Sequence, residues 1–315
     1  MTVCGAEWAA GDARDTVTTA NVTLRGGLAT QLAVSARADV VSIRLRHRTH
    51  TFEPMEMAAF AALLRPETIV LDIGANIGWW TFNFATTHAV HAFEPNPSNL
   101  AVQALSRCLN PRLARRITTY PVGLYDREPA SCELHSHPRN LGNTHTLCGT
   151  IEEIAAKVRR HEPLALRGSV EMRMLDTLVP PWLFRADKLL KMDVEGSELV
   201  ALKGATRLLT SGTPPRGIFM EVTFFRGQER RALYQWLQRR DYRPAQVVRY
   251  NMLFVHQKHP QQGRNGAAQA VCDDYCAFHP PPACNHTCGL KLLQHCCDWW
   301  GATNPSTNTR VFTPS

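Results

Sequence analysis

Short apolar runs alternate with longer segments of helical spacing through the middle of the chain. Five of the runs have the length of buried strands: residues 68–72, 89–93, 117–122, 188–193 and 217–221. The segments with a helical apolar repeat are 78–86, 97–109, 198–209 and 228–240. Strands that alternate with helices predict an α/β fold with a Rossmann-like, doubly wound and mostly parallel sheet.

The pattern changes at both ends of this region. Residues 243–249 and 252–256 favour two strands joined at Tyr250 and Asn251, which predicts an antiparallel terminal hairpin. Ahead of the first core strand, residues 52–64 favour a helix. The sheet is therefore expected to carry an antiparallel edge.

Two further runs near the N-terminus lean towards strands, at 21–25 and 40–46, and we expect them to form an entry hairpin or edge strands. With 315 residues, 44% of them hydrophobic, the chain can bury one full core and carry a small appendage. We therefore expect three parts: a β extension at 1–50, the main domain at 51–258 and a Cys-rich tail at 259–315.

The connection at 126–170 is long, polar and without a clear period. Long connections at the carboxyl edge of such sheets often cover a ligand, so we interpret this segment as a substrate lid, with a surface insertion as the alternative. It contains His145, a secondary candidate for a catalytic base. Asp126, at its start, is included among the candidate cofactor-binding residues.

A glycine turn follows the first core strand in the stretch LDIGANIG at 71–78. Gly74 and Gly78 allow the backbone to turn tightly and to approach a ligand. Asn76 occupies the place of the second glycine of a dinucleotide fingerprint, where its side chain crowds a pyrophosphate. Asp72 could face an ammonium group, and Glu94 could accept both hydrogens of a ribose diol. The pattern favours S-adenosylmethionine over NAD.

A second group of acids follows the strand at 188–193, at the sheet edge where ligands bind in doubly wound folds. Methyl transfer to a hydroxyl requires alignment of the oxygen and removal of its proton, and a carboxylate can do both. Asp193 is the first candidate for this role and Glu195 the second. Glu198 is better suited to stabilising the start of the next helix. Glu221 ends a neighbouring strand and is a secondary candidate.

The segments LDIGANIG, FEPNP and LKMDVEGSELVALKGATRLL together resemble the FkbM-type family of S-adenosylmethionine-dependent methyltransferases, over about residues 53–256. The resemblance implies that Asp72, Gly74, Asn76, Gly78 and Glu94 hold the cofactor. It also implies O-methylation of a sugar or natural-product hydroxyl. The adjacent Trp79 and Trp80 depart from the family pattern, and at least one of them is expected to pack in the core.

Six of the ten cysteines lie in the tail: Cys272, Cys276, Cys284, Cys288, Cys296 and Cys297. Their spacing allows nested disulfides, and with nearby histidines it also allows a zinc site. The other four, Cys4, Cys108, Cys132 and Cys148, look unpaired by spacing. Disulfides in the tail and the sequons at Asn21 and Asn285 slightly favour the secretory pathway over the cytoplasm.

The net charge of +8 is spread along the chain rather than gathered, so a nucleic-acid partner is disfavoured. No segment reaches the roughly 18 consecutive apolar residues of a membrane span. The expected partner is a small-molecule or glycan acceptor, and the oligomeric state is left open. Two other functions remain alternatives: a cofactor- or carbohydrate-binding module without turnover, and an NAD-dependent oxidoreductase.

Overall fold

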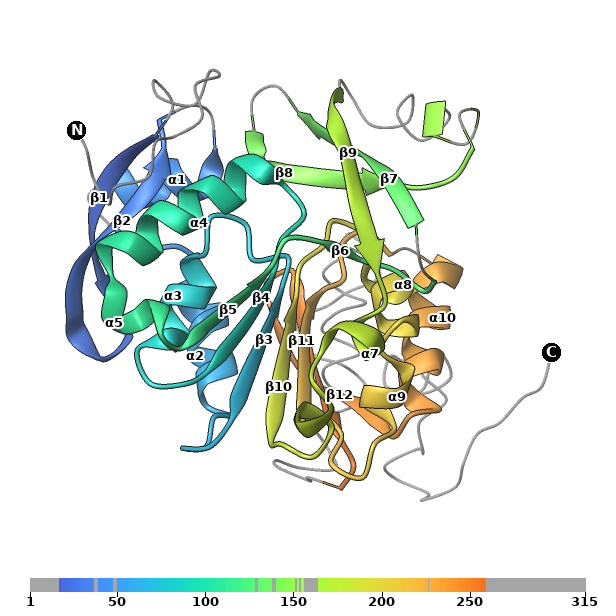
Figure 1. The fold of residues 1–315 in the computed structure, drawn as a ribbon. Helices are drawn as coiled ribbons and strands as arrows, with labels where there is room; N and C mark the ends of the chain where they lie inside the picture. The colour runs from blue at the N-terminus through green and yellow to red at the C-terminus, as the bar shows by residue number, and fades with distance from the viewer. Residues whose placement is uncertain are drawn as a thin grey trace, which may run out of the picture.

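The computed structural model describes residues 17–258, apart from 37–38, 48–49, 128–129, 138–139, 151, 153, 156–163 and 226. The described part is a mixed α/β structure whose centre is a seven-stranded sheet in the order β12-β13-β11-β10-β3-β4-β5. Helices lie on both sides of this sheet, and a second sheet lies above the carboxyl ends of its strands (Figure 1). The predicted Rossmann-like α/β fold is confirmed.

Five neighbouring strands of the main sheet are parallel: β3 (Ile69–Ile73), β4 (Val90–Phe93), β5 (Ile117–Tyr120), β10 (Lys188–Met192) and β11 (Gly217–Glu221). The last two strands, β12 (Tyr242–Val248) and β13 (Asn251–His256), form an antiparallel hairpin on the edge of β11. The predicted terminal hairpin is therefore confirmed.

The central strands β3, β4 and β10 are buried along their whole length because helices cover both of their faces. Adjacent residues Val70 and Leu71 of β3 belong to two different hydrophobic clusters, one on each face. One face carries α2 (Pro54–Ala61), α3 (Trp79–Ala85), α4 (Pro97–Leu109) and α5 (Pro111–Ala114). The other carries α7 (Leu175–Leu178), η2 (Pro181–Phe184), α8 (Glu198–Lys203), α9 (Thr206–Leu209) and α10 (Gly227–Gln238). The single helix expected at 198–209 is thus two short helices.

The N-terminal hairpin consists of β1 (Val17–Leu24), the turn η1 (Arg25–Gly27) and β2 (Leu28–Ser35). It packs on α4, where the Ala33 amide donates to Ser106 Oγ over 2.9 Å. The expected second strand at 40–46 is wrong: this segment is the helix α1 (Val40–Arg46). The Asp39 carboxylate caps it by accepting from the Ser42 amide, and Val41 and Leu45, one turn apart, are both buried.

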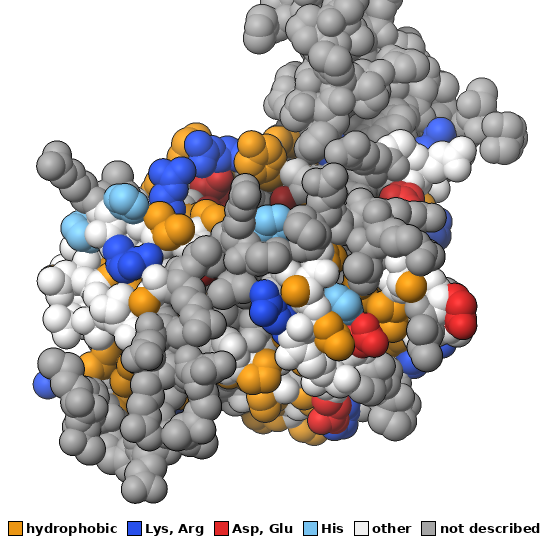
Figure 2. All heavy atoms as spheres, turned by 90° about the horizontal axis from the view of Figure 1, so that it is seen from above, with side chains coloured by type: hydrophobic (Ala, Val, Ile, Leu, Met, Phe, Trp, Pro, Cys, Tyr) orange, Lys and Arg blue, Asp and Glu red, His pale blue; other side chains and the backbone are white. Residues whose placement is uncertain are grey.

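The segment expected to be the least regular forms a second sheet, which corrects that expectation. Its strands β6 (Gly123–Leu124), β7 (Ala130–His137), β8 (Asn140–Leu147) and β9 (Ala165–Arg173) have the order β6-β9-β7-β8. Alternate residues Val170 and Met172 of β9 pack with Leu134 of β7 in a small apolar cluster. This two-residue period is the normal signal of a half-buried strand. On the face seen in Figure 2, the basic side chains of the described residues are mixed with acidic and apolar ones.

Cys132 and Cys148 form a disulfide that ties β7 to the end of β8. Cys108 is disulfide-bonded as well. The expectation that these three cysteines are unpaired is therefore wrong, because strand pairing brings Cys132 and Cys148 together although 16 positions separate them. The cysteines of the expected tail cluster lie outside the described residues.

Replacing both Cys132 and Cys148 with alanine is expected to lower the free energy of unfolding by roughly 3 kcal/mol, the chain-entropy effect of opening a loop of about this length. Urea unfolding of wild type and double variant without reductant measures the difference. Peptide mapping of the denatured, unreduced wild type supplies the control. Alkylation of either thiol there would contradict the pairing.

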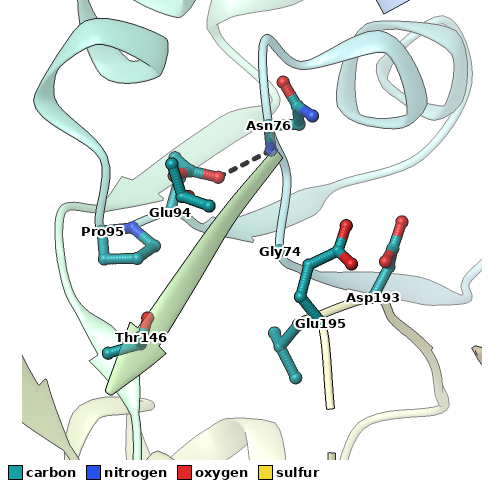
Figure 3. A pocket seen from close by; sticks show the side chains of 9 residues that line it. Gly74, Asn76, Glu94, Pro95, Thr146, Asp193 and Glu195 are labelled. Carbon is teal, nitrogen blue, oxygen red and sulfur yellow. Dashed lines mark hydrogen bonds between the residues drawn. The ribbon is translucent and has the colours of Figure 1, made fainter. Parts of the chain in front are cut away.

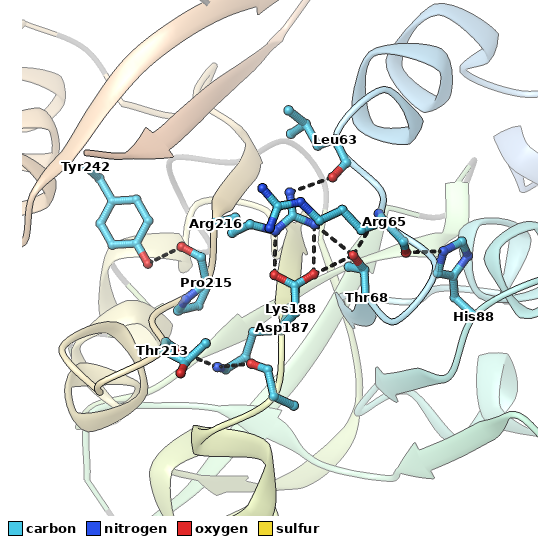
Figure 4. Close-up of polar contacts among 11 residues, drawn as sticks. Leu63, Arg65, Thr68, His88, Asp187, Lys188, Thr213, Pro215, Arg216 and Tyr242 are labelled. Atoms are coloured by element: carbon cyan, nitrogen blue, oxygen red, sulfur yellow. Dashed lines mark hydrogen bonds and ion pairs between the residues drawn. The ribbon is translucent and has the colours of Figure 1, made fainter. Parts of the chain in front are cut away.

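An ion pair between Arg216 and Asp187 lies at the amino ends of the strands of the main sheet. The Arg216 guanidinium donates to both carboxylate oxygens of Asp187, to the Leu63 carbonyl over 2.7 Å and to Thr68 Oγ1 over 2.7 Å (Figure 4). Burial alone would raise the pKa of Asp187, but the hydrogen bonds from Arg216 and Thr68 hold it below its usual value. These contacts hold the amino ends of β3, β10 and β11 together.

Candidate active site

The candidate site lies where the strand order of the main sheet reverses. From β3 the chain moves outward to β4 and β5, whereas from β10 it moves to β11 on the other side. In open α/β sheets, ligands bind in the crevice at the carboxyl ends of such strands. A cavity opens there, lined by Gly74, Asn76, Glu94, Pro95, Thr144, Thr146, Asp193, Val194 and Glu195 (Figure 3).

The turn after β3 forms the floor of the cavity. Gly74, Asn76 and Gly78 all have left-handed backbone conformations, with φ of 77°, 52° and 92°. A Cβ atom on Gly74 would lie 1.8 Å from the Asp193 carbonyl oxygen, so only glycine fits between the ends of β3 and β10. Asn76 is a residue type that tolerates this conformation.

Glu94 forms one wall and is almost completely buried, at 3% exposure. Its Oε2 accepts from the Asn76 amide over 2.7 Å, and its Oε1 accepts from the Asn96 amide over 2.8 Å. Burial raises the pKa of Glu94 to about 7, although the hydrogen bonds from Asn96, Asn76 and Asn99 oppose this rise. The carboxylate therefore holds the glycine turn and also titrates near neutral pH.

The opposite wall carries Asp193 and Glu195, which follow β10, and a third acid, Glu221, approaches them from the end of β11. Among the described residues, Asp193, Glu195 and Glu221 form one group whose carboxylate oxygens lie within 4.8 Å of one another, a spacing that would also suit a cation. In Figure 3 the Asp193 and Glu195 side chains point the same way, across the turn from Glu94. Burial, followed by the charge of Asp193, raises the pKa of Glu221 to about 8.

The DVEG turn at 193–196, which carries Asp193 and Glu195, is stabilised by Glu198. The buried Glu198 Oε1 accepts from the amides of Val194 and Gly196, over 3.1 and 3.3 Å. Burial raises the pKa of Glu198 to about 7, against the effect of these amides. Glu195 has a left-handed φ of 54°, which is costly for a non-glycine residue and directs its side chain to the cavity. Glu198 thus shapes the turn and does not line the cavity.

Four residues expected at the site do not line the cavity: Asp72, Gly78, Asp126 and His145. Gly78 directly precedes α3, where its carbonyl accepts from the Phe82 amide over 2.9 Å. Asp72 is fully buried beneath the turn, where it accepts from Thr81 Oγ1 over 2.6 Å and faces the Lys191 ammonium. Asp126 pairs with its neighbour Arg127 over 3.6 Å. His145 lies beside the Phe224 ring, at 6.0 Å between centroids. The ammonium group that faces Asp72 is therefore that of Lys191, and not that of a ligand.

Strand alternation explains the position of His145. Its neighbours Thr144 and Thr146 line the cavity, and successive side chains of a strand point to opposite faces. The two threonines are site residues that sequence reasoning missed, and their spacing of two positions was the available signal. Trp79 and Trp80 are both buried in the core, which confirms the expected packing.

A second, more apolar cavity adjoins the first and shares Gly74, Pro95, Thr146 and Val194 with it. Its remaining lining comes from the ends of β3 and β4, from the second sheet with the residue before it, and from the start of α8: Ile73, Phe93, Val122, Gly123, Leu124, Met172 and Ser197. The site as a whole therefore has a polar part between Glu94 and Asp193 and an apolar extension beside Glu94.

Solved structures similar to this chain include two methyltransferases. The methyltransferase FkbM from Methylobacillus flagellatus KT is 21% identical, with a TM-score of 0.41, over 62% of this chain and 46% of that one. The precorrin-6y C5,15-methyltransferase from Geobacter metallireducens GS-15 is 11% identical, with a TM-score of 0.36, over 70% of this chain and 94% of that one. The chain thus spans less than half the length of the first.

None of the curated proteins matches the chain in sequence. A family model described as the methyltransferase FkbM domain matches residues 72–244, which is more than half of the 315 residues. The match begins at Asp72 and includes the glycine turn, Glu94 and the DVEG turn. The chain therefore belongs to the FkbM methyltransferase family.

Proposed function

We propose that this protein is an S-adenosylmethionine-dependent O-methyltransferase that acts on a hydroxyl of a glycan or small metabolite. The observation that carries the proposal is the opposition of two acidic walls across one glycine turn: Glu94 on one side, and Asp193 with Glu195 on the other. The first wall suits a ribose diol, and the second suits an acceptor hydroxyl. Membership of a methyltransferase family supports the same reaction class.

The residues around the glycine turn fit S-adenosylmethionine better than a dinucleotide. Glu94 would bind the ribose hydroxyls, and the backbone of Gly74 and Asn76 would bind the amino-acid end. The apolar cavity lined by Phe93, Pro95 and Leu124 has the character that a flat base requires. Once bound, the cofactor supplies an electrophilic methyl group on a sulfonium. Asn76 stands where a pyrophosphate would need glycine.

Asp193 is the proposed base or orienting acid for the acceptor. It lines the cavity, its side chain is one-third exposed, and its carboxylate lies beside those of Glu195 and Glu221. A hydroxyl aligned there would donate to the carboxylate and lose its proton to it as the oxygen–carbon bond forms and the carbon–sulfur bond of the methyl donor breaks. Glu221 would remain protonated at neutral pH, because burial and the Asp193 charge raise its pKa to about 8.

Titration of Glu94 gives a test of the cofactor assignment. Burial raises the pKa of Glu94 to about 7, and only the ionised carboxylate accepts two ribose hydrogens, so affinity should rise with pH. We expect the Kd of S-adenosylmethionine to fall about tenfold between about pH 6 and 8. In Glu94→Gln the affinity for S-adenosylmethionine should be at least about tenfold weaker than in wild type, and it should not change with pH. Isothermal titration calorimetry measures both.

Calorimetry with NAD is the matched experiment. Micromolar binding of NAD without binding of S-adenosylmethionine would contradict the cofactor assignment and favour an oxidoreductase. Methyl transfer is tested with labelled S-adenosylmethionine and a panel of sugars, glycans and small alcohols, followed by location of the label on oxygen. Cofactor binding without any labelled product would favour a binding module instead.

We also propose an oxidising compartment, in the secretory pathway. The Cys132–Cys148 disulfide and the exposed sequon residue Asn21 support it. The division into a β extension, a methyltransferase domain and a Cys-rich tail, with boundaries near 50 and 258, stays a proposal. Within the described residues, none of the helices combines the length and the apolar character that crossing a bilayer requires.

A further inference from the structure

A buried lysine connects the two strand ends that form the site. Lys191 is the fourth residue of β10, with 5% exposure. Its ammonium donates to the Gly74 carbonyl oxygen over 2.7 Å. It also lies 3.4 Å from Asp72 Oδ1 and 3.8 Å from Asp193 Oδ2. One cation therefore contacts the glycine turn, the acid beneath it and the acid that lines the cavity.

The surroundings leave this ammonium little freedom. Asp72 is fixed on its other oxygen by Thr81 of α3, and the Trp80 ring lies 5.9 Å from the Lys191 nitrogen. Burial alone would lower the pKa of Lys191, but the carboxylates of Asp72 and Asp193 hold it above its usual value. A buried charge with good partners stays ionised and keeps its geometry.

The position of Lys191 gives it a part in the reaction geometry. The backbones of β3 and β10 also meet at this point, where the Asp193 amide donates to the Ile73 carbonyl over 3.0 Å. That bond fixes the Asp193 backbone but leaves its side chain free to rotate. Lys191 contacts the side chain, and at the same time the carbonyl of the turn proposed to hold the cofactor.

We propose that Lys191 is a positioning residue for methyl transfer, whose ammonium holds the Gly74 carbonyl and the Asp193 carboxylate at a set separation. This inference rests on the proposed function, because the separation matters only if cofactor and acceptor meet between the two groups. Misplacement of reacting groups by about 1 Å can cost about 10²-fold in rate. The positioning role therefore predicts that loss of Lys191 lowers kcat even in a variant whose stability is largely retained.

A matched control lies on the same strand. Lys188 is also fully buried, and its ammonium donates to the carbonyls of Ala186, over 2.8 Å, and Thr213. These contacts are at the amino end of β10 (Figure 4), whereas the cavity lies at its carboxyl end. Lys188→Met therefore removes a buried ammonium from β10 without touching the site.

Removal of Lys191 alone would leave Asp72 as an uncompensated buried charge, which could prevent folding. A double variant, Lys191→Met with Asp72→Asn, removes both charges. The new asparagine keeps an oxygen that accepts from Thr81 Oγ1. In this double variant we expect the thermal stability to recover most of what Lys191→Met loses. The kcat should still be about 10²-fold below wild type, with a much smaller change in acceptor KM. In Lys188→Met, stability should fall while kcat is unchanged.

Amide hydrogen exchange of the cofactor-free proteins provides a measurement that does not depend on turnover. The turns at 74–78 and 193–196 are expected to exchange faster in the double variant than in wild type and in Lys188→Met. Unchanged exchange in these turns, or wild-type kcat in the double variant, would overturn the positioning role. A wild-type protein that neither binds S-adenosylmethionine nor transfers its methyl group would refute the proposed function alone, while the exchange result would still decide whether Lys191 holds the two turns.

Discussion

Asp193→Asn is expected to lower kcat for methyl transfer by about 10²- to 10⁴-fold, the usual contribution of a general base, while cofactor binding is retained. The reason is geometric. Asp193 lines the cavity opposite Glu94, on the side proposed for the acceptor, and its side chain is one-third exposed. Asparagine has nearly the same shape but cannot take up the proton. The measurement is the initial rate of label transfer from S-adenosylmethionine, with calorimetry of the cofactor in parallel.

Asp126→Asn is the matched control for this prediction. It makes the same chemical change at an acid that sequence reasoning also placed at the site, but that pairs with Arg127 and does not line the cavity. Its kcat should equal that of wild type. A wild-type rate in Asp193→Asn would move the base elsewhere, with Glu195 and Glu221 as the next carboxylates of the same group.

Gly74→Ala is expected to abolish cofactor binding and to destabilise the protein. The added Cβ would lie 1.8 Å from the Asp193 carbonyl oxygen, and φ at this position is 77°. The left-handed conformation costs an alanine about 1–2 kcal/mol. The forced separation of the ends of β3 and β10 should add roughly 1–3 kcal/mol, as overpacking does in cores. Urea unfolding and calorimetry with S-adenosylmethionine measure the two effects.

Gly26→Ala separates the two causes. Gly26 has almost the same φ, 79°, but apart from its chain neighbours no atom of the described residues lies within 4 Å of the position of its Cβ. This variant should therefore show only the conformational cost and bind the cofactor as wild type does. Equal destabilisation of the two variants, with cofactor binding intact in both, would mean that the close approach of Gly74 to Asp193 does not shape the site.

The sequence predicts the main sheet well because its strands are buried on both faces. Most residues of these strands are apolar, and the connecting helices show their own period. The same local signals place Gly74, Glu94 and Asp193 at strand ends. Since carboxyl ends of parallel strands meet at one edge, these residues were expected together, and the structure brings them to one cavity.

The errors occur where local preference and tertiary packing disagree. The β-branched residues at 40–46 favour a strand, but the Asp39 cap and the burial of Val41 and Leu45 on one face produce a helix. In the second sheet, only alternate residues pack, so its strands looked irregular in a polar sequence. The partner of Cys132 depended on the pairing of β7 with β8, which spacing along the chain does not reveal.

The sequence by itself determined the α/β class, the order of the core elements and the acids at the strand ends, because these follow from local periodicity and from the chemistry of single residues. Only the tertiary structure decided what each acid faces. Asp72 and Asp193 both lie near the ends of apolar runs and both contact Lys191, yet the first is fully buried beneath the glycine turn and the second lines the cavity. Burial and charge partners depend on side chains brought together from distant parts of the chain, and so does the raised pKa of Glu94.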